Sequence, residues 1–270
     1  MSEVPPAADE PAVLLSVSNG VATIALNRPD THNGFNQDTA ADLCSAATNI
    51  ANDDTIRAVL IVAKGRVFSV GGDVGVFAST AVETLPETLE SMATTYHQAL
   101  SILAGLEVPV VTAVQRAAAG AALGLLYVSD IVLADEGAKF ALGFGRIGLA
   151  GDGGTSWFLP RLVGARRAAE LYFENRTLDA REAAAWGLIT RAVPSAELRD
   201  QAARLAQKLA TGPTRAYGAM RRLFWESANA DLVSQLDREA ETIGRIAQTA
   251  DAANAFASFR ARQEPQFAGR

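Results

Sequence analysis

The chain contains little cysteine and little histidine: one cysteine (Cys44) and two histidines (His32 and His97) among 270 residues. A single cysteine excludes a disulfide framework and a cysteine-based zinc site. Cys44 lies in an alanine-rich helical pattern, which is typical of a small buried residue. No apolar run reaches the roughly 20 residues that a membrane-spanning helix needs. We therefore expect a soluble cytoplasmic protein that uses no membrane and no metal.

An excess of positive charge is also missing. The chain has 24 Lys and Arg against 30 Asp and Glu, which gives a net charge of −6. This balance argues against a nucleic-acid or anionic-membrane surface as the partner. The first residues, MSEVPPAADEPA, are acidic and proline-rich, and we expect residues 1–12 to form a disordered tail.

Hydrophobic residues make up 49% of the chain, enough for a large core, and strand and helix patterns alternate through its first part. The pattern predicts an α/β core over residues 13–197 and an all-helical region over 198–270. Alternating residues around Asn19-Gly20 predict a hairpin. The expected elements are strands at 13–18, 21–26, 58–63, 109–114, 131–134 and 139–142, and helices at 37–52, 83–106, 117–128, from 154, from 179 to 187 and from 198, with a break at Gly212-Pro213.

Several common catalytic and cofactor motifs are absent or occur in the wrong context. Residues 143–148 read GFGRIG and match the dinucleotide fingerprint GxGxxG, but further glycines follow where a long helix should begin. There is no GxxxxGK[ST] loop and no GxSxG elbow. These observations argue against a Rossmann site, a P-loop and a serine hydrolase.

Asp152 is the acid that the sequence singles out, because it stands in the glycine-rich stretch GLAGDGG with Trp157, Phe158 and Leu159 behind it. A carboxylate near apolar bulk tends to have a raised pKa, which suits proton transfer near neutral pH. The alternative is that Asp152 caps the helix beginning near Gly154 by accepting hydrogen bonds from its first N–H groups. The segment by itself does not decide between these two interpretations.

Two further glycine-rich segments follow expected buried strands: residues 68–73 (FSVGGD) and residues 118–124 (AAGAALG). Each offers backbone N–H groups with little side chain in the way. Two such groups aimed at one carbonyl oxygen would form an oxyanion hole. Tight packing of small residues between helix and sheet is the alternative explanation for each segment.

Three stretches decide how these features are interpreted: PVVTAVQRAAAGAALGLLYVSDIVLAD, AKFALGFGRIGLAGDGGTSWFLPRLVGARRAAEL and LDAREAAAWGLITRAVP. In this order and spacing they closely resemble the crotonase (enoyl-CoA hydratase/isomerase) superfamily, and the resemblance runs from about Val13 to the end. It implies a spiral of ββα units, a C-terminal helical trimerisation region and an acyl-CoA thioester as ligand. The oxyanion-hole amides would be those of Gly72 and Ala121, and coenzyme A would be part of the substrate rather than a separate cofactor.

The departures from the family pattern narrow the chemistry. Hydratases of this family use two glutamates, whose positions fall here on Gly124 and Phe144, and neither can move a proton. Asp152 instead matches the aspartate of the dienoyl-CoA isomerase and epoxide–oxepin isomerase branch, where it shuttles a proton along the enolate. One mobile carboxylate is enough for that reaction.

A second branch is also similar. Tyr96-His97-Gln98 lies upstream of Pro109 with the spacing of the chlorobenzoyl-CoA dehalogenases. There the matching aspartate attacks the aromatic ring and the histidine activates water. His97 is thus a candidate catalytic residue, although a surface or packing role on its amphipathic helix is the alternative. The supporting aromatic in that branch is tryptophan, whereas this chain has Phe144.

The resemblance also suggests where coenzyme A and the acyl group bind. The backbone near Gly71 and the cations Arg28, Lys64 and Arg66 are candidates for coenzyme A, with solvated surface charge as the alternative for each cation. Arg260, Arg262 and Phe267 are expected to reach the coenzyme A of a neighbouring subunit. Phe77, Phe144 and Trp157 are expected to shape the acyl pocket, whereas Arg116 stands where the family usually has glycine and has no explanation from sequence.

We therefore expect a homotrimer or a dimer of trimers that isomerises an unsaturated acyl-CoA, with Asp152 as the acid/base. Two alternatives stay open. The first is a hydrolytic aryl- or acyl-CoA enzyme in which Asp152 is the nucleophile. The second is a protein that binds acyl-CoA without turning it over.

Overall fold

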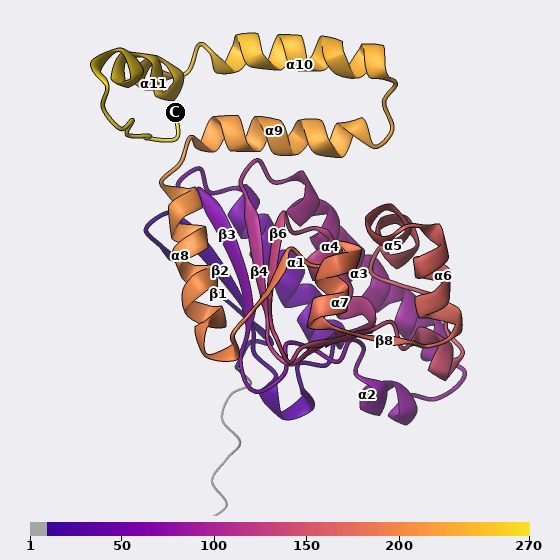
Figure 1. The fold of residues 1–270 in the computed structure, drawn as a ribbon. Helices are drawn as coiled ribbons and strands as arrows, with labels where there is room; N and C mark the ends of the chain where they lie inside the picture. Colours follow the sequence, from indigo (N-terminus) through magenta and orange to yellow (C-terminus); the bar gives the residue numbers. More distant parts are fainter. Residues whose placement is uncertain (1–9) are drawn as a thin grey trace, which may run out of the picture.

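The computed structural model describes residues 10–270, and most of the expected elements are present (Figure 1). The strands are β1 (Val13–Ser18), β2 (Val21–Leu26), β3 (Ala58–Ala63), β4 (Val110–Val114), β5 (Ala117–Ala119), β6 (Ile131–Asp135), β7 (Lys139–Ala141), β8 (Thr177–Asp179) and β9 (Arg191–Val193). The α-helices are α1 (Gln37–Ala51), α2 (Val74–Ser79), α3 (Leu85–Gly105), α4 (Leu123–Tyr127), α5 (Thr155–Val163), α6 (Ala165–Phe173), α7 (Ala180–Trp186), α8 (Leu198–Ala210), α9 (Thr214–Ser227), α10 (Leu232–Ile246) and α11 (Ala250–Ala261). Short 3-10 helices are η1 (Pro29–Thr31), η2 (Gly120–Ala122), η3 (Phe144–Ile147) and η4 (Ser195–Glu197).

Two sheets organise the core. The larger has the order β1-β2-β3-β4-β6-β9, and the smaller has the order β5-β7-β8. The hairpin β1–β2 is antiparallel, and from β2 onward the large sheet is parallel. Parallel strands require crossover connections, so the chain leaves and re-enters the sheet repeatedly, and this generates the alternating α/β order.

Helices cover both faces of the large sheet, because strands such as AVLIVA are apolar on both sides. One cluster of buried residues joins the sheet to α1 and α3, and a second joins it to the alanine-rich face of α8. Figure 1 shows α8 on one side of the sheet and α1 with α3 on the other. No helix among residues 10–270 is long and apolar enough to cross a membrane.

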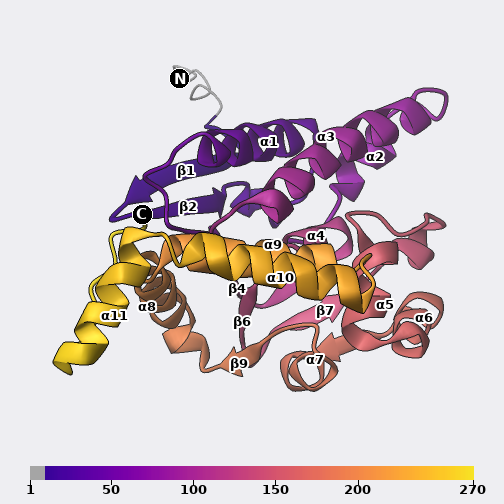
Figure 2. The same cartoon turned by 90° about the horizontal axis from the view of Figure 1, so that it is seen from above.

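The last three helices form a separate layer. Figure 2 shows α10 lying over α9, with α11 beyond the end of α8. The break between α8 and α9 falls at Gly212-Pro213, as predicted, since proline at this point cannot continue the preceding helix. Among the described residues, none covers α10 enough to bury one of its side chains.

Two expectations need correction. The run Ala117–Val128 is not one helix: it forms strand β5, then η2, then the short helix α4. Gly120 has φ +53, a left-handed value that interrupts helical propagation after the strand. Of the expected tail, residues 1–12, the first nine lie outside the described residues. Within residues 10–12, Ala12 is buried and its N–H donates to Asp42 Oδ2 at 2.7 Å, so this part is ordered.

Candidate active site

A cavity of about 370 Å³ opens between α3, the segment after β3 and the segment Leu142–Asp152. Its wall is almost entirely apolar side chains and backbone, with Glu90 and Asp152 as the carboxylates that border it. Residues that line it include Gly72, Phe77, Leu89, Met92, Ala93, Ala121, Leu142, Phe144, Ile147 and Leu149. Phe77 and Phe144 line the same cavity as Gly72 and Ala121, the two residues predicted to supply amides.

The two predicted oxyanion residues are brought together by the folding of their loops. A parallel bridge between Ser69 and Ala118 aligns the segment after β3 with β5. Gly71 has φ +84, and a Cβ there would lie 2.6 Å from the carbonyl oxygen of Ala119, so only glycine fits this close approach. Within residues 10–270, the N–H groups of Gly72 and Ala121 donate to no protein acceptor, and both residues face the cavity.

Asp152 is held by a loop that relies on glycine. Gly148, Gly153 and Gly154 have φ of +70, +63 and +79, values that place the chain before α5 in left-handed conformations. The backbone carbonyl of Asp152 accepts hydrogen bonds from the N–H of Thr155 at 3.2 Å and from its hydroxyl at 2.7 Å. No side chain caps α5. The interpretation of Asp152 as a helix cap is therefore wrong for its carboxylate, which remains available to other groups.

The Asp152 carboxylate instead contacts His97 on α3. The distance from His97 Nε2 to Asp152 Oδ1 is 2.5 Å, and the two side chains are 48% and 25% exposed, respectively. The structure thus brings together two residues that lie 55 positions apart in sequence.

A second cavity, of about 430 Å³, lies on the other side of this pair. Asp152 borders both cavities, whereas His97 borders the second. Trp157 borders the second cavity too, where its ring stacks on Trp225 of α9 with centroids 5.9 Å apart. The expectation that Trp157 shapes the same pocket as Phe77 and Phe144 is therefore wrong, because α5 turns this ring toward α9.

Gly124 and Phe144, which the family resemblance matches to the two hydratase glutamates, carry no carboxylate. A Cβ on Gly124 would lie 2.6 Å from the hydroxyl of Tyr96 and 2.8 Å from the Gly153 carbonyl, so no larger side chain fits. The Tyr96 hydroxyl donates to the Ala121 carbonyl at 2.7 Å. Burial, followed by the nearby Asp152 charge, raises the pKa of Tyr96, which keeps it a neutral donor. No motif assigns Tyr96 a role, because the partner of its hydroxyl is a backbone carbonyl distant in sequence.

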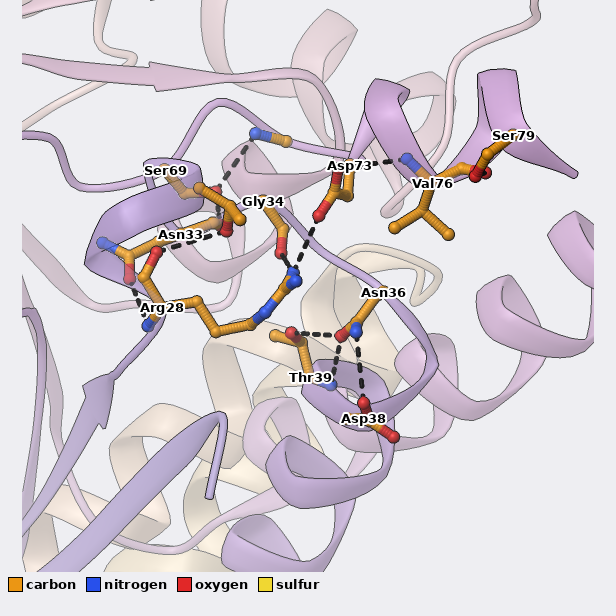
Figure 3. A network of polar contacts seen from close by, with 12 residues as sticks. Arg28, Asn33, Gly34, Asn36, Asp38, Thr39, Ser69, Asp73, Val76 and Ser79 are labelled. Carbon is orange, nitrogen blue, oxygen red and sulfur yellow. Dashed lines mark hydrogen bonds and ion pairs between the residues drawn. The ribbon is translucent and has the colours of Figure 1, made fainter. Parts of the chain in front are cut away.

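The predicted cation Arg28 is used inside the protein (Figure 3). Its Nη1 pairs with Asp73 Oδ2 at 3.0 Å and also donates to the Gly34 carbonyl. Asn33, buried and at φ +55, accepts from the Arg28 N–H at 2.8 Å. These contacts tie the loop after β2 to the residue that follows Gly72, so Arg28 supports the loop that carries the amide.

The other predicted coenzyme A contacts are placed as follows. Lys64 and Arg66 are exposed on the turn after β3. The N–H of Gly71 donates to Ser69 Oγ at 3.1 Å. Near the end of the chain, the Phe267 carbonyl accepts a hydrogen bond from Arg57 Nη2 at 3.2 Å. Arg57 directly precedes β3, whereas Lys64 directly follows it, so the two lie at opposite ends of this strand. This end of the chain therefore lies away from the cavity described above.

Arg116 and His32 now have structural explanations. Arg116 has φ +60, a conformation that favours glycine, and its N–H donates to Asp135 Oδ2 at 2.8 Å. His32, with φ +54, accepts a hydrogen bond at its carbonyl from the Val70 N–H at 3.2 Å. Both residues shape turns. No group of three or more His, Cys, Asp or Glu side chains in the described part of the chain could hold a metal ion.

Comparison with known proteins identifies the family. A family model described as enoyl-CoA hydratase/isomerase matches residues 16–270. The chain belongs to the enoyl-CoA hydratase/isomerase family. It is 35% identical to the 1,2-epoxyphenylacetyl-CoA isomerase of Escherichia coli K12 over 258 residues, which cover 96% of this chain and 98% of the relative.

Two further members of the enoyl-CoA hydratase/isomerase family bear on the site. The 4-chlorobenzoyl coenzyme A dehalogenase-2 of an Arthrobacter species is 30% identical, over 84% of this chain and 82% of its own length. A structure named as an enoyl-CoA hydratase/isomerase from Mycobacterium abscessus superposes with a TM-score of 0.89 at 37% identity, covering 96% of this chain and 100% of that one. The α/β fold with its helical C-terminal region is thus that of the family, as predicted, and the family is one of enzymes.

Proposed function

We propose that this protein isomerises an unsaturated acyl-CoA by moving a double bond relative to the thioester. The N–H groups of Gly72 and Ala121 bind the thioester oxygen, and the Asp152 carboxylate transfers the proton. The 1,2-epoxyphenylacetyl-CoA isomerase relative supports an isomerase of acyl-CoA, and family membership supports the acyl-CoA ligand.

The chemistry follows from the placement of these groups. Asp152 removes a proton from the α carbon, and the electron pair moves into the thioester, which leaves an enolate oxygen. Two N–H donors aimed at that oxygen stabilise the developing charge, and one donor contributes about 3–4 kcal/mol in comparable sites. The same carboxyl then returns a proton to the γ carbon as the double bond moves.

One observation carries the proposal: a carboxylate and two N–H groups, for which residues 10–270 provide no acceptor, border one apolar cavity. The positions of the hydratase glutamates are Gly124, where no side chain fits, and Phe144, which cannot transfer a proton. Addition of water by two acids therefore lacks the groups it needs. Glu90, the other carboxylate bordering the cavity, is exposed on α3.

The test compares two variants of the same chemical kind on a panel of 3-enoyl-CoA esters. Asp152→Asn keeps the size of the side chain but cannot accept the proton, so kcat should fall by at least about 100-fold, the usual contribution of a positioned acid/base. Glu90→Gln should stay near wild type. Ultraviolet absorption of the conjugated 2-enoyl product gives the rate. Wild-type turnover by Asp152→Asn would overturn the assignment.

A hydrolytic aryl-CoA reaction is the second candidate, favoured by the contact of His97 with Asp152 and by the dehalogenase relative. The Asp152 carboxylate would displace halide from the ring of a 4-halobenzoyl-CoA, and water would then cleave the resulting aryl ester. Mass spectrometry of the quenched enzyme would detect an aryl adduct on Asp152 and thereby favour this reaction. Tight acyl-CoA binding without turnover of any ester would instead favour a non-catalytic binder.

Assembly and location complete the proposal. We expect a homotrimer or a dimer of trimers in the cytoplasm, with Lys64, Arg66 and the Gly71 backbone near coenzyme A. Because Arg28 pairs with Asp73, we expect it to act through the loop rather than as a free cation for phosphate. Arg260 and Arg262 remain candidates for contact with a neighbouring subunit's ligand.

A further inference from the structure

The two cavities differ in the side chains that border them. The first cavity, of about 370 Å³, is expected to hold the acyl group. Apart from Glu90 and Asp152, it is lined by apolar side chains and backbone. The second cavity has four polar side chains beside Asp152, which are His97, Ser101, Ser156 and Asn229. An apolar ligand is expected to displace water from the first cavity, whereas polar groups can hold water in the second.

The His97–Asp152 pair lies where the two cavities meet. Asp152 borders both, and the imidazole that contacts its Oδ1 borders the second. The His97 side chain is 48% exposed, so the imidazole is in contact with solvent. A proton on Asp152 thus has a route to water that does not pass through the space reserved for the acyl group.

We propose that the second cavity is the route by which the Asp152 carboxyl exchanges its proton with solvent, through His97, while the acyl group fills the first cavity. The inference rests on the proposed proton-transfer function of Asp152. It assigns His97 as a positioning and relay residue that acts through Asp152 without touching the substrate.

The steps balance in protons and charge. The α-carbon proton passes to Asp152, leaving the enolate held by the two N–H groups. The carboxyl gives this proton to the lone pair of His97 Nε2, which forms an imidazolium beside a carboxylate. The imidazolium then turns away from Asp152, and the proton on its Nε2 exchanges for a solvent proton with water in the second cavity. When the ring returns to Asp152, its Nε2 gives this solvent proton to the carboxylate, which delivers it to the γ carbon.

The consequence is measurable as isotope content. In D2O, a single turnover of trans-3-hexenoyl-CoA by the wild type should give product that carries mostly deuterium at the γ carbon. Without the route, Asp152 would return the proton it took, and the product would carry mostly protium. Mass spectrometry or proton NMR of the product distinguishes the two.

Matched variants test the cavity and the relay separately. Ser101 lies one helical turn after His97 on the same face of α3, so Ser101→Leu should obstruct the second cavity. Ser101→Ala removes the hydroxyl without filling the space. His97→Gln can donate to Asp152 but cannot relay a proton. We expect Ser101→Leu and His97→Gln to lower the γ-deuterium fraction several-fold with smaller changes in kcat, and Ser101→Ala to resemble wild type.

Failure of the route and failure of the isomerase are distinguishable through α-hydrogen exchange of hexanoyl-CoA in D2O, which needs enolate formation but no double bond. If the wild type exchanges the α-hydrogens of hexanoyl-CoA but moves no double bond, the isomerase proposal is wrong and the proposed proton route through His97 still stands. Equal deuterium incorporation in wild type, Ser101→Leu and His97→Gln would overturn the route, as would protium retention at the γ carbon of the wild-type product. Absence of both migration and exchange in the wild type would remove the proton transfer by Asp152 on which the route rests. An aryl adduct on Asp152 would assign the same cavity to the hydrolytic water instead.

Discussion

At the scale of single residues, the site depends on positions where a side chain is missing as much as on Asp152. Gly71 and Gly124 each allow another group to approach to a distance that a Cβ would prevent. The neighbour of Gly71 is the backbone before Ala121, and the neighbour of Gly124 is the hydroxyl of Tyr96. Both glycines therefore hold the strand–helix junction that presents the second amide.

Gly124→Ala should destabilise the protein by about 1–3 kcal/mol, the usual cost of forcing extra volume into a packed interior. The new methyl would lie 2.6 Å from the Tyr96 hydroxyl and 2.8 Å from a backbone oxygen. Equilibrium denaturation with urea measures the change. Gly105→Ala, where nothing lies within 4 Å of the added Cβ at the end of α3, is the control and should be neutral or slightly stabilising. Equal stability of the two variants would contradict this packing argument.

At the scale of elements, one arginine joins three helices. Arg221 of α9 is 4% exposed, and its Nη atoms donate to the carbonyls of Leu103 and Ala104 in the last turn of α3. It also donates to the Val128 carbonyl at the end of α4 at 2.9 Å, and its Nε pairs with Asp130 at 2.9 Å. The C-terminal carbonyls of these helices have no intrahelical partners, so this side chain attaches the C-terminal layer to the core.

Arg221→Met should therefore cost about 3 kcal/mol or more, because the substitution leaves buried carbonyls and one side of an ion pair without partners. The adjacent Arg222 pairs with Glu107 at the surface at 2.9 Å, with side chains 43% and 55% exposed. Arg222→Met should change stability by less than about 1 kcal/mol, as exposed pairs do. Thermal unfolding followed by circular dichroism compares them. A similar loss in both variants would show that the network at Arg221 is not what holds α9.

At the scale of the whole molecule, the C-terminal layer exposes apolar side chains that residues 10–270 do not cover. Leu232, Val233, Leu236 and Ile243 of α10 are between 53% and 72% exposed, and Phe224 of α9 is 65% exposed. An apolar surface of this kind is typical of a protein–protein contact. It agrees with the trimer expected from the family resemblance, which stays a prediction.

Sedimentation velocity tests the assembly. The wild type should sediment as a trimer or hexamer, and the double substitution Val233→Glu with Leu236→Glu should sediment as a smaller species with unchanged circular dichroism, because burying two carboxylates in an apolar contact is costly. Phe173→Glu on α6, where the residue is 78% exposed, is the control and should leave the assembly intact. A monomeric wild type would remove this prediction.

The sequence determined the local elements and the chemical candidates. Apolar runs predicted β3 and β4, and Asn19-Gly20 predicted the hairpin. Asp152 was singled out because a carboxylate near apolar side chains is costly to desolvate unless it has a partner or a function. These signals are local, because periodicity and turn chemistry act over a few residues. The run Ala117–Val128 misled for the same reason: its composition favours a helix, but β5 pairs with β7 and Gly120 turns the chain.

Tertiary structure decided what each candidate faces. The contact of His97 with Asp152, the close fit of Tyr96 against Gly124, the use of Arg28 by Asp73 and the placement of Trp157 in the second cavity all join residues distant in sequence. A side chain's partner depends on how the sheet and helices pack, and that packing is a property of the whole core rather than of any motif. The chain's residues supplied a carboxylate and two amides; the fold alone placed them at one cavity.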